Sequence, residues 1–100
     1  MIHVIAIITA KPGHRDDIIA RVRNNMPAVI SEEGCIEYRP VVDAASTLSG
    51  GFGPDTLVIV EKWRDEHCLK NHAASLHMKH YSDSVKPFIQ ERDIRILKDI

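Results

Sequence analysis

Two segments of the chain, residues 2–9 and 57–63, restrict the fold more than any other feature because both are rich in Ile, Val and Leu. Runs of this length and composition predict β-strands. Side chains alternate between the two faces of a strand, and here apolar side chains fall on both faces of each segment. The predicted sheet therefore needs a cover on each side.

Turn and cap residues divide the rest of the chain into elements. Residues 11–13 are typical of a turn, Gly34 of a helix end, and Asp65 and Ser75 of helix starts. The predicted strands are 2–9, 35–42 (with Ile36 and Tyr38 on one side), 57–63 and 93–97, with a loop at 43–55. The predicted inward stripes are Ile18, Ile19, Val22, Met26, Val29 and Ile30 in the first helix, then Leu69, His72 and Leu76, then Met78, Tyr81 and Val85.

The order strand, helix, strand, strand, helix, strand predicts a ferredoxin-like α+β domain with an antiparallel sheet. A chain of 100 residues is expected to form one such domain, spanning residues 1–100. Both helical regions of this unit lie on one face of the sheet. A second copy of the chain is the simplest cover for the other face, so we expect a homodimer that packs sheet against sheet.

Charge and composition exclude several kinds of partner. With 13 Lys and Arg against 14 Asp and Glu and no block of like charge, nucleic acid and anionic membranes are not expected as main partners. No apolar run approaches the roughly 20 residues of a membrane span, and residues 1–9 lack a secretory signal, so we expect a cytoplasmic protein. In that compartment Cys35 and Cys68 are expected to be reduced thiols.

Four histidines fall within 14 residues, at positions 67, 72, 77 and 80, which raises the possibility of a metal site. On one continuous helix, residues five apart are rotated by about 140°, so His72 would diverge from both His67 and His77. Only His77 and His80 have the spacing of three that metal pairs prefer, and no third ligand is evident. The spacing therefore predicts no native metal site.

Several short motifs, taken in order, resemble the antibiotic biosynthesis monooxygenase (ABM) superfamily, and within it the bacterial quinol monooxygenases. The motifs are Glu32-Glu33-Gly34-Cys35-Ile36-Glu37-Tyr38, Glu61-Lys62-Trp63, His72 followed five residues later by His77-Met78-Lys79, and Ile94-Arg95-Ile96-Leu97. The resemblance covers the whole chain. It implies a dimeric α+β barrel and, for some members, oxidation of a quinol or related hydroxylated aromatic by dioxygen with no flavin, haem or metal cofactor.

The same resemblance defines the candidate site. His72 is the preferred catalytic base because imidazole titrates near neutral pH, and His77 is the second candidate. Each has a structural alternative. His72 would be a core histidine bonded to a backbone carbonyl or to Glu61, and His77 a solvated side chain at a helix end. The substrate-binding candidates are Trp63 as an aromatic wall, Glu61 and Tyr38 as polar groups, Met78 beside His77, and Phe52 as a lid on the long loop. The alternatives are a core anchor for Trp63, a packing role for Tyr38, and for Phe52 a contact with a partner chain or with its own domain.

Two other functions remain open from the sequence. The first is a non-catalytic or sensory dimer that binds a small hydrophobic molecule. The second is haem binding or degradation, but the haem-degrading relatives use an Asn on the first strand, and residues 1–10 contain none. A further departure is Leu76, which stands where quinol-oxidising relatives tend to carry Pro.

Overall fold

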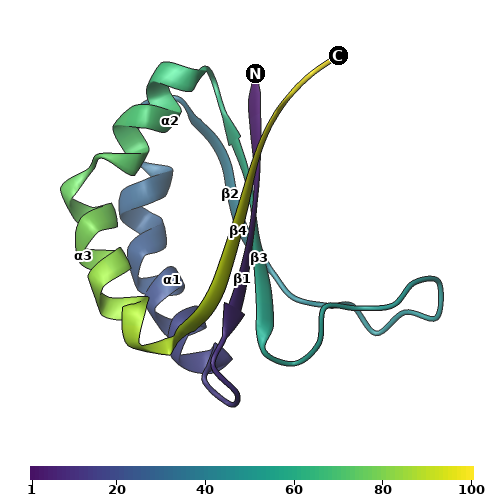
Figure 1. The fold of residues 1–100 in the computed structure, drawn as a ribbon. Helices are drawn as coiled ribbons and strands as arrows, with labels where there is room; N and C mark the ends of the chain where they lie inside the picture. Colours follow the sequence, from purple (N-terminus) through teal and green to yellow (C-terminus); the bar gives the residue numbers. More distant parts are fainter.

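The computed structural model describes residues 1–100 and contains a four-stranded antiparallel sheet with three helices on one face (Figure 1). The strand order is β2-β3-β1-β4, which confirms the predicted ferredoxin-like α+β topology. The elements are β1 (Ile2–Ala10), α1 (Arg15–Ile30), β2 (Cys35–Val41), β3 (Thr56–Trp63), α2 (Glu66–Ala73), α3 (Leu76–Val85), the short 3-10 helix η1 (Lys86–Phe88) and β4 (Ile89–Lys98). None of the helices has both the length and the apolar character needed to cross a membrane.

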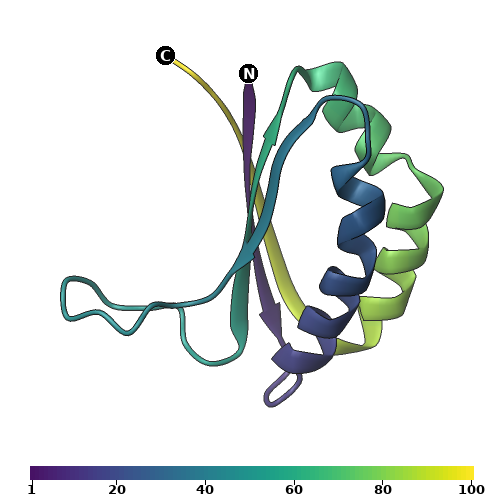
Figure 2. The ribbon, with the colours of Figure 1, turned by 180° about the vertical axis from the view of Figure 1, so that it is seen from behind.

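The core lies between the sheet and the helices, which form a separate layer in the reverse view as well (Figure 2). Alternate residues of β1 and β3 point into this layer, and each central strand pairs with the other in register from Ile2 with Trp63 to Thr9 with Thr56. The helices bury their apolar stripes against these positions. The largest fully buried side chains are Trp63, Ile18, Leu57, Val22, Val29 and Val85.

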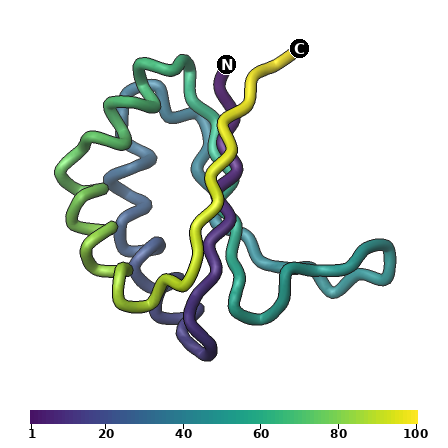
Figure 3. Tube along the Cα trace, in the orientation of Figure 1, coloured from purple at the N-terminus to yellow at the C-terminus, as the bar shows by residue number.

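No helix covers the opposite face of the sheet. Ile5, Ile7 and Val60 are partly exposed there, and Leu97 of β4 is about half exposed. The 43–55 loop projects from this side, away from the helices (Figure 3). The structure therefore agrees with the prediction that the sheet has two apolar faces and that the helices of the same chain cover only one of them.

Four local predictions are wrong, each for a physical reason. A β-bulge between Cys35 and Glu37 leaves Ile36 exposed and places Cys35 opposite Trp63. The second helical region is interrupted at residues 74–75, and Ser75 caps a new helix, so Leu76 leaves the inward stripe and is 68% exposed. Ile30 follows the buried Val29, so it is rotated by about 100° away from the inward face of α1 and is 54% exposed. Finally, β4 begins at Ile89 because it pairs with β1 over nearly its whole length.

Gly34 controls how closely α2 approaches the turn after α1. Its φ of +79° is in the left-handed region that favours glycine, and its carbonyl accepts a hydrogen bond from the Arg64 backbone N–H at 2.8 Å. A Cβ at this position would lie 2.7 Å from the Cβ of Cys68, on the first turn of α2, and closer still to its sulfur. The absence of a side chain therefore lets α2 dock against this turn.

We predict that Gly34→Ala lowers the free energy of unfolding by about 3 kcal/mol or more, because it combines left-handed strain with overpacking against Cys68. Gly13→Ala is the matched control: Gly13 has a φ of +81°, but a Cβ added there would have no atom within 4 Å, so only the strain of about 1–2 kcal/mol applies. Urea denaturation of both variants measures the difference. Equal losses would contradict the close approach of α2.

Candidate functional site

A cavity of about 630 Å³ opens between the sheet and the α2–α3 layer. It forms because the helices leave the helix-facing side of β4 uncovered, so Ile94 and Ile96 remain more than half exposed beside buried residues of β1. Its volume falls in the range of small-molecule sites. Most of its wall is apolar, and its main apolar residues are Val4, Ala6, Ile8, Ile59, Leu69, Met78, Ile94 and Ile96.

His72 is the most deeply buried titratable side chain that lines this cavity, with 4% of its surface exposed. It lies on α2, and its Nδ1 is 2.6 Å from the Oε2 atom of Glu32, in the turn after α1. Its ring lies 4.6 Å from the Trp63 ring and 5.8 Å from the Tyr38 ring, centroid to centroid. These contacts fix the orientation of the imidazole.

One interpretation of the sequence expected Glu61 to bond to His72. Glu61 lies beside His72 but forms no hydrogen bond with it. Its Oε1 accepts a hydrogen bond from the indole N–H of Trp63 at 2.9 Å. Burial raises the pKa of Glu61 above its ordinary value, although the bond from Trp63 and the nearby His72 act to lower it. Burial also raises the pKa of Tyr38, with Glu61 adding to the effect, so the phenol is neutral at physiological pH.

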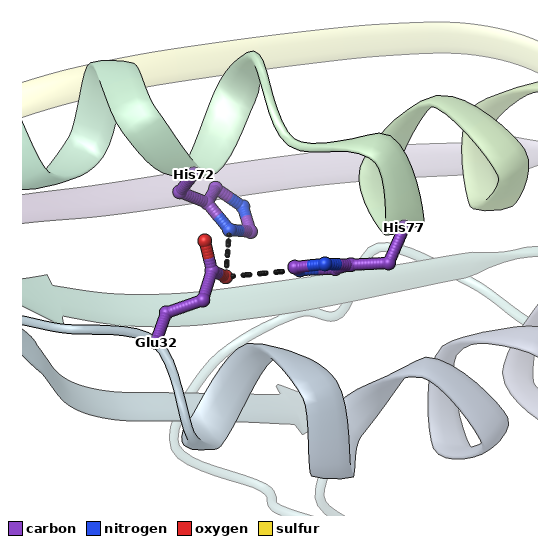
Figure 4. A group of neighbouring side chains, drawn as sticks. All are labelled: Glu32, His72 and His77. Carbon is purple, nitrogen blue, oxygen red and sulfur yellow. Dashed lines mark hydrogen bonds and ion pairs between the residues drawn. The ribbon is translucent and has the colours of Figure 1, made fainter.

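His77 contacts the same oxygen of the Glu32 carboxylate as His72, with its Nε2 3.2 Å from Oε2 (Figure 4). This nitrogen also lies 3.3 Å from the Ser75 hydroxyl. The sequence argument that His72 and His77 must diverge is wrong because it assumed one continuous helix. The break before Ser75 starts α3 in a new direction and returns His77 to the same carboxylate. His67 and His80 are exposed.

The structure brings together four of the seven predicted site residues on the wall of the cavity: His72, Glu61, Tyr38 and Met78. Trp63 is fully buried behind His72, and His77 contacts Glu32 without lining the cavity. Phe52 is 60% exposed on the projecting loop, where its backbone N–H donates to Asp43, and it does not line the cavity.

Two polar residues of the site were missed by the sequence analysis. Glu32 is 40 positions from His72, so no local spacing connects them, and it appeared only within a family motif. Tyr81 was assigned to the buried stripe of α3, but the residue also lines the cavity, and its buried hydroxyl has no hydrogen-bond partner in the protein. Burial raises the pKa of Tyr81, which keeps the hydroxyl available as a donor.

Comparison with known proteins identifies the family. Residues 1–84 match the family model described as antibiotic biosynthesis monooxygenase. The chain belongs to this family. It is 40% identical to "Probable quinol monooxygenase YgiN" of Escherichia coli K12, over 98% of this chain and 97% of that protein.

Two solved structures share the fold of this chain. PA3566 from Pseudomonas aeruginosa has a TM-score of 0.82 and 25% identity, with 99% of this chain and 93% of that chain covered. A conserved protein from Methanosarcina mazei Go1 has a TM-score of 0.85 and 25% identity, with 99% and 92% covered. The family model and the 40% identical relative confirm the ABM assignment made from short motifs.

We predict that the free energy of unfolding of Glu61→Gln increases, relative to that of the unaltered protein, as the pH rises from about 4 to about 7. A carboxyl whose pKa is raised on folding stabilises the folded state at low pH and loses that contribution as the pH rises through its folded-state pKa. Glutamine removes this loss and can still accept the bond from Trp63. Urea denaturation across this pH range measures the trend, and Glu91→Gln on the exposed surface of β4 is the control. A pH-independent difference for Glu61→Gln would contradict the raised pKa.

Proposed function

We propose that the protein is a monooxygenase that oxidises a quinol or a related hydroxylated aromatic with dioxygen, without an organic cofactor. Family membership and the similarity to a probable quinol monooxygenase support this class of reaction. The observation that carries the proposal is the position of His72: an oriented imidazole on the wall of a mostly apolar cavity. Such a site suits a flat aromatic ring that must lose a proton.

The contact with Glu32 supports the role of His72 as the base. When a carboxylate accepts from Nδ1–H, the lone pair of a neutral imidazole is at Nε2. That nitrogen can take the proton of a quinol hydroxyl. The resulting anion is electron-rich and can pass one electron to dioxygen, which yields a substrate radical and superoxide within the cavity.

The remaining polar groups of the cavity suit the binding of the substrate oxygens. The Tyr81 hydroxyl is buried, neutral and without a partner, so a substrate oxygen that accepts its hydrogen bond would satisfy it. Tyr38 is a second neutral donor beside His72. The apolar wall excludes water from the anion, which favours its reaction with dioxygen.

We predict that His72→Gln lowers protein-dependent oxygen uptake with chemically reduced menadiol by a factor of about 10² or more, because it removes the base. An oxygen electrode measures the rate after background autoxidation is subtracted. His67→Gln, on the exposed surface of α2, is the matched control and should retain the full rate. Uptake that is absent from the unaltered protein, or equal in both variants, would refute the proposed mechanism; the first result would favour a binding protein without catalysis.

We also propose that two copies of the chain pack their uncovered sheet faces together as a homodimer. The support is the apolar surface that no helix of the same chain covers, which includes Ile5, Ile7 and Val60. The burial of such a surface against a second copy removes it from water, and isologous packing uses the same patch on both chains.

We predict that Ile7→Lys converts the dimer into a species with the 11.3 kDa mass of one chain. The substitution places a charge in the proposed interface. In the separated chain, Asp93, which lies opposite residue 7 on β4, can pair with the lysine. Sedimentation at micromolar concentration measures the mass. Ala20→Lys, on the exposed surface of α1, is the control and should remain dimeric. A monomeric unaltered protein would contradict the proposal.

A further inference from the structure

Two imidazole nitrogens on different helices point toward one oxygen atom. Nδ1 of His72 and Nε2 of His77 lie 2.6 Å and 3.2 Å from Oε2 of Glu32 (Figure 4). The ligand atoms of the three residues all lie within 4.8 Å of one another. A pair of histidines with one carboxylate is a donor set that binds divalent zinc and ferrous iron in proteins.

We propose that Glu32, His72 and His77 form a binding site for one divalent transition-metal ion. Three ligand atoms that each lie about 2 Å from a tetrahedral ion are about 3.3 Å apart, close to the spacing between Glu32 and His77. The nitrogens of His72 and His77 lie within 4.8 Å of each other and must likewise come to about 3.3 Å. The Glu32 to His72 separation must widen, by less than about 1 Å. Glu32 can supply this movement because its carboxylate is at the end of a flexible side chain in a turn.

The surroundings of the cluster also suit a metal ion. The exposed fractions of the Glu32 and His72 side chains are 14% and 6%, so water competes weakly for them. Ser75 holds its hydroxyl 3.3 Å from Nε2 of His77 and also lines the cavity, which places one further oxygen beside the ligands. Three protein ligands leave a coordination position for water or a small ligand.

Metal binding has a consequence for the site that rests on the proposed function. An ion at Nδ1 of His72 takes the lone pair of that nitrogen, and the single proton of the neutral ring then resides on Nε2. Nε2 can no longer accept a proton from a quinol. The metal-bound state is therefore inactive as a base, and metal binding and quinol oxidation exclude each other.

Titration of the metal-free protein with Co²⁺ tests the site directly, with visible d–d absorption and calorimetry as readouts. We expect one ion per chain, and a dissociation constant that rises at least about 10-fold in Glu32→Gln and in His77→Gln. Circular dichroism of each variant verifies its fold. The controls, His67→Gln and His80→Gln, remove exposed histidines of the same helices and should bind as the unaltered protein does. The absence of saturable binding, or binding that depends on His80 rather than Glu32, would overturn the proposal.

Oxygen uptake with reduced menadiol then tests the exclusion. Zn²⁺ is expected to inhibit the unaltered protein with a midpoint equal to the dissociation constant of Zn²⁺. It is expected to inhibit His77→Gln only at concentrations at least about 10-fold higher. Each rate is compared with the metal-free rate of the same protein. Stimulation by Zn²⁺ would overturn the exclusion. A protein that binds Co²⁺ but shows no uptake would refute the proposed function and leave the metal site standing, so the two failures are distinguishable.

Discussion

The structure depends on how the two faces of the central strands, β1 and β3, are covered. One face receives all three helices and forms the core around Trp63 and Ile18. The helices do not extend over β4, and the same incomplete cover that leaves Ile94 and Ile96 exposed also forms the cavity. A cavity in the size range of small-molecule sites is thus a by-product of covering four strands with a narrower layer of helices.

The polar part of the site depends on two interruptions of regular structure. Gly34 adopts a left-handed conformation and lets α2 lie close to the turn that carries Glu32. The break before Ser75 then redirects α3, so that His77 approaches the same carboxylate from another side. A carboxylate and two imidazoles meet where three segments converge, although none of these segments alone contains a recognisable site.

His72 is central because Glu32 contacts one of its two nitrogens, Nδ1. Nδ1 is held by Glu32, and the ring lies against Trp63 and Tyr38 on the wall of the cavity. The nitrogen that carries the ring proton decides whether the residue acts as a base, and a proton or a metal ion at Nδ1 gives opposite answers. In the two proposals made above, one arrangement of side chains therefore serves both catalysis and its inhibition by metal.

The sequence alone determined the order and type of the elements, because strand alternation, helix stripes and the caps Asp65 and Ser75 are local signals. It also identified the family and four residues of the cavity wall, since inward stripes of adjacent elements face the same space. Only the tertiary structure decided that Glu32, rather than Glu61, holds His72 and that His77 joins them. The reason is that these contacts connect residues across a turn, a helix break and 40 positions of chain, where the period of a single helix no longer relates one side chain to another.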